Sequence, residues 1–188
     1  MGILSYFKNK AEENKVKKIE ANNKINNMIL NNANKFMVIK DKKGFNFKID
    51  NVGLIETKSV RRSNYSGGSY RVTKRGSYRM GSTTSESFDV KKHVDNGKLV
   101  VTDKNISFVG NNKTRSLDVK KIIDVEYYSD GVMFSASNLK KPVTFFSNDA
   151  VVSKTIPILI AMIFDKDRAV NLINNVKSKI EANNESIQ

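Results

Sequence analysis

The sequence predicts an α+β protein in which a small antiparallel β-barrel lies between helical segments. Short apolar stretches separated by turn residues run from 97 to 146, as in a β-meander. Residues 3–34 contain no Gly or Pro, and residues 149–181 form an apolar segment followed by an amphipathic one. With 188 residues, the chain is long enough for one ordinary domain and its appendages.

The segment from Ile3 to about Asn34 is predicted to be a helix, because several of its apolar residues lie three or four positions apart. The apolar stripe is thin, and Lys, Glu and Asn occupy the other faces. Asn has a poor helix propensity, so we expect this helix to be stabilised by packing against a partner surface or another copy of itself. A loosely attached, solvated helix is the alternative. Residues 1–35 are therefore predicted to form an N-terminal helical extension.

The pattern changes at the end of this extension. Apolar and polar residues alternate around a Lys42-Lys43-Gly44 turn, which predicts a short hairpin, or a linker followed by a strand. The alternating apolar residues are Phe36, Val38, Phe45, Phe47 and Ile49. Residues 57–85 predict one or two polar strands, with turns at Gly67-Gly68 and at Gly76.

Residues 97–146 predict an antiparallel meander that forms a barrel or sandwich. The tail predicts one broken helix or two short helices over 149–164 and 165–181, with Pro157 at a kink or a helix start. We expect one of these helices to cap an open end of the barrel. The predicted barrel with its capping helix is then 36–165, and 166–188 is a C-terminal helix with a frayed tail.

The composition argues against an enzyme and against a metal site. The chain has no Cys, and His93 is its single His, which excludes a thiolate site and a cluster of His ligands. The carboxylates are scattered: Asp124 and Glu126 share a strand face but have no further acidic partners in sequence. We therefore expect no catalytic residue, no metal and no cofactor.

The longest apolar run, 156–164, is shorter than the roughly 20 residues that a membrane-spanning helix needs. We expect it to be a core helix packed on the barrel, and a membrane-facing or partner-facing helix is the alternative. No secretory signal is visible, and the lack of Cys agrees with a reducing compartment. The expected location is the cytoplasm.

A basic segment is the main functional feature of the sequence. Seven cations and no carboxylate lie between Thr57 and Ser85, and they equal half of the formal net charge of +14. Such a segment has no charge of its own to neutralise it, so it favours an acidic partner. Interleaved Tyr residues add surfaces for stacking on bases or for a lipid interface. The candidate ligand-binding residues are Lys58, Arg61, Arg62, Tyr65, Arg71, Lys74, Arg75, Tyr78 and Arg79.

Several segments resemble a known family when they are taken in order. Residues 97–110, GKLVVTDKNISFVG, are similar to the strand-turn-strand signature of GRAM-like and bacterial pleckstrin-homology-like domains. The basic Gly/Tyr segments 65–74 and 78–82, together with IDVEYYSDGV at 123–132 and KKPVTFF at 140–146, resemble segments of uncharacterised bacterial and phage members. The resemblance covers about 61–146. Asn105 departs from it, because the family often has Arg there.

This resemblance implies a bent, seven-stranded antiparallel barrel capped by a C-terminal helix, and it implies no catalytic activity. Domains of this kind bind phosphoinositides, peptides or other proteins. Our first hypothesis is a non-enzymatic binding module that presents a basic face to an acidic protein or an anionic membrane surface. A nucleic-acid-binding accessory protein of a phage or mobile element is the second. The third is an assembly protein that forms a homo-oligomer through the N-terminal helix.

Overall fold

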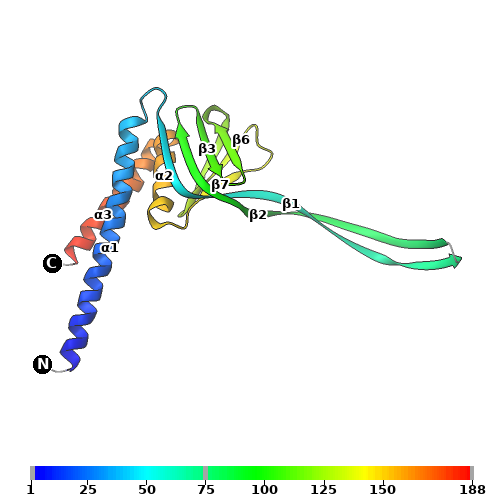
Figure 1. The fold of residues 1–188 in the computed structure, drawn as a ribbon, viewed down its shortest axis with the longest axis horizontal. Helices are drawn as coiled ribbons and strands as arrows, with labels where there is room; N and C mark the ends of the chain where they lie inside the picture. The colour runs from blue at the N-terminus through cyan, green and yellow to red at the C-terminus, as the bar shows by residue number, and fades with distance from the viewer. Residues whose placement is uncertain (1–2, 74–75, 187–188) are drawn as a thin grey trace.

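A curled, seven-stranded antiparallel sheet packs against helices in the computed structural model (Figure 1). The structure describes the backbone of residues 3–73 and 76–186. It also describes their side chains, except those of 3–9, 11, 68–73 and 76–80. The elements are α1 (Ile3–Ile39), β1 (Asn46–Thr73), β2 (Gly76–Thr102), β3 (Asn105–Gly110), β4 (Thr114–Asp118), the 3-10 helix η1 (Val119–Lys121), β5 (Ile122–Tyr127), β6 (Gly131–Ala136), β7 (Val143–Phe146), α2 (Ala150–Phe164) and α3 (Lys166–Glu185).

The strands follow the order β4-β3-β2-β1-β7-β6-β5. The predicted α+β class and the antiparallel meander over 97–146 are confirmed. The sheet is an open half-barrel, because β4 and β5 are its two edges and are not paired with each other in the described chain.

Phenylalanine rings fill the concave side of the sheet. The ring of Phe145 on β7 lies 6.1 Å from that of Phe108 and 5.6 Å from that of Phe134, centroid to centroid. All three side chains are fully buried. Alternation along the strands places these rings on one face, so that Leu54 of β1 and Leu99 of β2 complete the same core.

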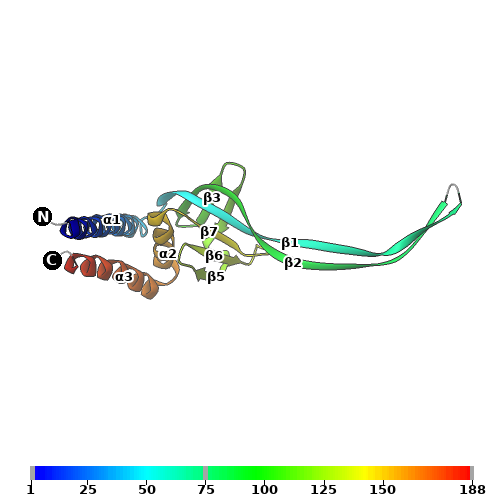
Figure 2. The same cartoon turned by 90° about the horizontal axis from the view of Figure 1, so that it is seen from below.

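Helix α2 is the centre of the fold. Residues 155–162 are all buried, so the helix is covered on every side, as expected of a helix that is apolar all round. It lies between the sheet and the pair formed by α1 and α3 (Figure 2). The predicted core helix is confirmed, and each large side chain that it buries contributes roughly 1.5–3 kcal/mol.

The predicted pair of tail helices is also confirmed. Asp149 caps the start of α2 by accepting hydrogen bonds from the backbone N–H groups of Val151 and Val152, both at 2.9 Å. Asp165 separates the two helices and caps α3 by accepting from the N–H of Arg168 at 3.0 Å. Capping side chains of this kind satisfy backbone donors that the helix itself leaves free.

Helix α1 extends further than the sequence predicts. The residues around Phe36 are helical, so the hairpin expected there is wrong. The alternative, a linker followed by a strand, agrees with the start of β1 at Asn46. Ile29, Ala33 and Phe36 are buried at spacings of four and three, and the Phe36 ring packs edge-on against Phe45 at 5.7 Å. The alternation of Phe36 with Val38 has no structural meaning, because Val38 is 68% exposed.

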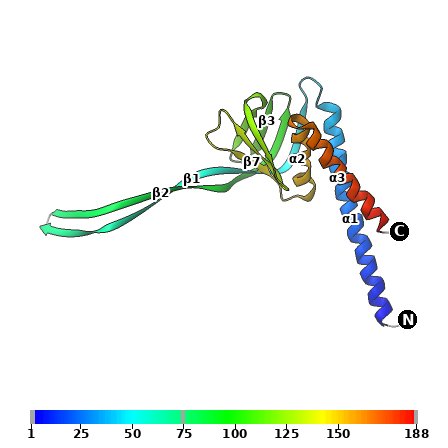
Figure 3. The ribbon, with the colours of Figure 1, turned by 180° about the vertical axis from the view of Figure 1, so that it is seen from behind.

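The other end of α1 projects away from the body. The Asn23 side chain donates a hydrogen bond to Asn184 and accepts one from Asn183, both at 2.8 Å, which ties α1 to α3. Beyond this point α1 continues past the end of α3 (Figure 3). The expected partner surface for this helix is therefore supplied by α2 and α3 of the same chain, but only along its C-terminal part.

The turn predicted at Gly67-Gly68 is wrong. Both residues lie inside β1, where they face Gly81 and Met80 across the pair, and the chain reverses between Thr73 and Gly76. A Cβ on Gly81 would lie 2.7 Å from Gly67 Cα and 2.8 Å from Tyr65 Oη. Gly67 and Gly81 therefore let the two strands and the Tyr65 side chain come close together, which is a common use of glycine in strands. They do not form a turn.

Gly97 and Gly110 form a cross-strand pair in which neither residue has room for a side chain. A Cβ on Gly97 would overlap the carbonyl oxygen of Val109, a backbone atom that can move only with its strand. We expect Gly97→Ala to lower the free energy of unfolding by about 1–3 kcal/mol, measured by urea denaturation. The exposed neighbour change Lys98→Ala is the control and should stay within about 0.5 kcal/mol. Equal values for the two variants would contradict the close packing of β2 and β3.

Candidate functional site

The two longest strands leave the body together as a ribbon. β7 pairs with β1 only at 53–56, and β3 pairs with β2 only at 97–101, whereas β1 and β2 stay paired from 57 and 91 outward. We call residues 57–73 and 76–91 the arm. At about 3.3 Å per residue it is roughly 50 Å long, and it stands clear of the half-barrel (Figure 1). In the described chain, no third strand covers either outer edge of the arm.

The body braces the arm at its root. Lys141, in the loop between β6 and β7, donates hydrogen bonds to Ser59 and to Asp89, and its Nζ lies 2.5 Å from Asp89 Oδ1. Ser59 Oγ donates to the same carboxylate at 2.7 Å. These donors, Lys141 first, hold the pKa of Asp89 below its ordinary value. Lys141 therefore already balances the charge of the Asp89 carboxylate. This carboxylate does not neutralise the exposed cations of the arm.

Further contacts hold β2 at the root of the arm. Lys91 Nζ lies 5.8 Å from the ring centroid of Tyr128, whose hydroxyl donates to Glu126 at 2.8 Å. The ring of His93 packs edge-on against Phe146 at 5.5 Å, and its Nε2 lies 3.0 Å from the carbonyl oxygen of Asp95. The described contacts of His93 thus hold the root of the arm.

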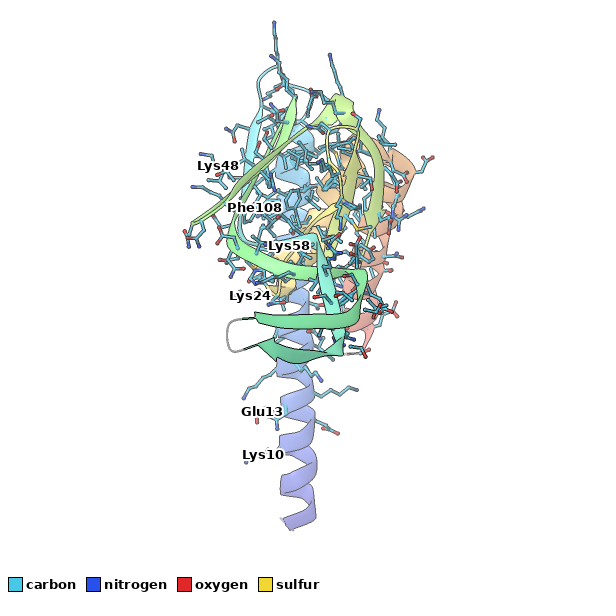
Figure 4. The ribbon with its side chains drawn as sticks, turned by 90° about the vertical axis from the view of Figure 1, so that its right-hand side faces the viewer. Lys10, Glu13, Lys24, Lys48, Lys58 and Phe108 are labelled. Atoms are coloured by element: carbon cyan, nitrogen blue, oxygen red, sulfur yellow. The ribbon has the colours of Figure 1, made fainter. Side chains whose placement is uncertain are left out.

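The described cations of the arm are exposed. No hydrogen bond or ion pair joins Lys58, Arg61 or Arg62 to another described residue. Figure 4 looks along the arm toward the body, with Lys58 near the root and Phe108 inside the half-barrel. These three side chains are therefore available to a negatively charged partner.

The register divides these cations between two faces. Directly opposed residues of an antiparallel pair share a face, and faces alternate along a strand. Lys58 is opposite Val90 and Arg62 is opposite Glu86, and both pairs continue the face that carries buried Glu56. We call this the core-side face. Arg61, opposite Ser87, lies on the outer face.

The remaining predicted residues lie along the same arm. Tyr65 is 55% exposed and has the same parity as Arg61, so it belongs to the outer face. Arg71, Tyr78 and Arg79 lie in the distal part, where the backbone register is described. Lys74 and Arg75 lie outside the described residues.

Sequence reasoning missed three exposed apolar residues on the core-side face. Val60, Phe88 and Val90 are 42%, 47% and 38% exposed, and Val60 is directly opposite Phe88. They continue the apolar face of the sheet beyond the point where the body covers it. The spacing of Phe88 and Val90 was a signal for a strand face, but their exposure depends on where the half-barrel ends.

Behind the root, a buried carboxylate neutralises two further cations. Glu56 has a side chain that is 10% exposed, and it accepts from Lys113 Nζ at 2.5 Å and Arg115 Nε at 2.6 Å. Burial raises the pKa of Glu56, but the hydrogen bonds from Arg115 and Lys113 outweigh it, so the pKa lies below its ordinary value. These two cations stabilise the body and are not part of the arm's free charge.

The described residues contain no group of three or more His, Asp or Glu side chains that could hold a metal ion. Within the described ranges, no helix combines the length and the apolar character needed to cross a bilayer.

No family model, curated protein or solved structure matches this chain. The candidate site therefore rests on the geometry of the arm.

Proposed function

We propose that this protein is a non-enzymatic binding module that holds nucleic acid with its arm. The observation that supports the proposal most directly is the set of exposed cations without partners in the described chain, Lys58, Arg61 and Arg62. They lie on a ribbon that leaves the body and has no role in the core. Phosphate groups are the natural counter-charges for Arg and Lys side chains in such a position.

The division of the cations between two faces favours nucleic acid over a membrane. A flat anionic surface meets one face of a ribbon at a time, whereas a polynucleotide carries phosphates along a flexible or grooved chain and can meet both. A two-stranded ribbon also has the dimensions to enter a groove of duplex DNA. An acidic protein, the other partner expected from the sequence, remains an outcome of the test below.

The scaffold that carries the arm fits the pleckstrin-homology-like resemblance. The seven strands curl into a half-barrel, and α2 packs against its concave side. In this proposal the half-barrel is a rigid base that fixes the direction of the arm, and Lys141 with Asp89 braces the junction. No catalytic step is required of any residue.

The test is a charge-reversal experiment. The triple variant Lys58→Glu, Arg61→Glu, Arg62→Glu should lose most of its affinity for short labelled oligonucleotides in fluorescence anisotropy. Each phosphate contact contributes about 0.7–0.9 to the slope of log affinity against log salt, so the slope should fall by about 2–3. The matched control reverses the exposed body residues Lys98, Lys104 and Lys120 and should retain most of the affinity.

Two results would overturn the proposal. One is a wild-type protein that binds no oligonucleotide at low salt. The other is an arm variant that binds as well as the body control. Vesicles containing anionic lipid and an acidic polypeptide are run in parallel, and arm-dependent binding to either of them without binding to oligonucleotides also rejects nucleic acid as the partner.

A further inference from the structure

The core-side face of the arm combines an exposed aromatic ring with cations on both sides of it. Phe88 and Val60 form one rung of the ribbon. Lys58 and Val90 form the next rung on this face toward the body, and Arg62 and Glu86 form the next rung outward. Rungs on the same face are about 7 Å apart, so each cation is one rung from the Phe88 ring.

We infer that this face is a stacking platform for single-stranded nucleic acid, an inference that rests on the proposed function and specifies its ligand. One base stacks on Phe88, and Lys58 and Arg62 hold the phosphates on its two sides. Proteins that bind single strands without sequence preference combine aromatic side chains and cations in this way. Duplex bases are stacked on one another and present no free face to Phe88.

The exposure of the apolar residues supports this assignment. Phe88 is 47% exposed, although it belongs to a strand whose other large apolar side chains at 99 and 101 are fully buried. Val60 lies directly opposite it and Val90 two positions along the same strand, so the exposed apolar surface extends to both neighbours of the ring. Charge complementarity selects the occupant: the apolar centre has a cation on each side, and a base with its phosphates has the complementary pattern.

Glu86 is the one acidic side chain among these three rungs, and it gives the inference a second test. It lies opposite Arg62, but no ion pair joins the two side chains in the described structure. Its carboxylate repels a phosphate held by Arg62. Glu86→Gln should therefore raise the affinity for single strands about two- to fivefold at low salt, which corresponds to removing one modest repulsion.

The main experiment uses fluorescence, because the chain contains no Trp. Phe88→Trp in the full-length protein introduces a single indole, and oligothymidylate should quench its emission with the same affinity that anisotropy reports. Ile123→Trp, at a body position that is 72% exposed, is the matched control and should not be quenched. Phe88→Leu should weaken single-strand binding about 5- to 100-fold and change duplex binding less than twofold, while Phe88→Tyr should keep the wild-type affinity.

The results separate this inference from the proposed function. If Phe88→Leu binds oligothymidylate as the wild type does, while the arm charge reversal abolishes binding, the platform is rejected and the proposed function stands. An equal loss on duplex and single strand also rejects the platform. If wild-type protein binds no nucleic acid, the proposed function fails and the inference fails with it. Unchanged melting temperatures for all variants show that the effects arise at the arm.

Discussion

Replacing the part of the arm beyond Val60 and Phe88 by a two-residue turn is expected to leave the half-barrel folded and to reduce nucleic-acid binding more than 100-fold. The design removes 61–87 and joins Val60 to Phe88 through Asn-Gly, because these residues are directly opposed in the register and Asn-Gly suits a two-residue hairpin turn. Ser59, Asp89 and Lys141 stay, so the root keeps its brace.

The physical reason is that the described residues of the removed segment are exposed and are not part of the core. The buried apolar residues lie on the body segments of the strands and on the helices, so their hydrophobic stabilisation survives the deletion. Thermal unfolding followed by circular dichroism should give a melting temperature within a few degrees of the wild type. Anisotropy with oligonucleotides measures the loss of binding.

A full-length variant in which Lys58, Arg61 and Arg62 are changed to Gln serves as the control for length. It keeps the ribbon and removes three charges, so its affinity should lie between that of the wild type and that of the deletion. An armless protein that still binds oligonucleotides as tightly as the full chain would show that the interface lies on the body. A deletion variant that does not fold would show that the arm stabilises the half-barrel.

Asp95→Ala is expected to lower the free energy of unfolding by about 3 kcal/mol. Asp95 is 7% exposed, and its carboxylate accepts hydrogen bonds from the backbone N–H groups of Asn96 at 2.9 Å, Asn112 at 2.7 Å and Lys113 at 2.8 Å. The latter two hold the turn between β3 and β4. Without the carboxylate these donors lose their partner, and the melting temperature should fall by about 6–12 °C.

The same residue makes the wild-type protein sensitive to acid. The N–H of Asn112, helped by those of Lys113 and Asn96 and opposed by burial, holds the pKa of Asp95 below its ordinary value. A carboxyl group with a lowered pKa in the folded state contributes stability above its unfolded pKa of about 3.9 and loses that contribution as the pH falls toward the folded pKa. Glu56 acts in the same direction.

Urea denaturation at neutral pH and at a series of acidic values tests both statements. Wild-type stability should fall below about pH 4, and the fall should be smaller in Asp95→Ala, which has one fewer group to protonate. Exposed Asp124 on β5 provides the control: Asp124→Ala should change the neutral-pH stability by less than about 0.5 kcal/mol. A similarly small change for Asp95→Ala would mean that the turn does not depend on the carboxylate.

Much of the body could be predicted from local patterns. The alternation and turns over 97–146 and the apolar run at 156–164 each depend on neighbours in sequence, and both predictions are confirmed. The failures at Phe36 and at Gly67-Gly68 have a different origin. Phe36 belongs to a helix because it continues the buried face of α1 on which Ile29 and Ala33 lie. Gly67 lies inside a strand because Gly81 stands opposite it.

The candidate site was predictable in composition but not in arrangement. The absence of carboxylates identified the basic segment, and its exposed cations lie on the arm. The face on which each cation lies depends on the cross-strand register. Irregularities near Ile49 and Leu54 shift this register at the root of the arm. The exposure of Phe88 had no sequence signal, because an aromatic residue on a strand is ordinarily buried and only the limit of the half-barrel leaves this one uncovered.

The unpaired edges of the ribbon affect the solubility of the protein. Rows of backbone amide and carbonyl groups along both margins offer sites where the ribbon of a neighbouring molecule could add itself edge to edge. Repulsion between like charges keeps such ribbons apart, and dissolved salt weakens that repulsion over distances of about 10 Å at 0.1 M. The positive charge to which we assign the binding of a polyanion thus also keeps the molecules dispersed, and their solubility should decline as that charge is neutralised.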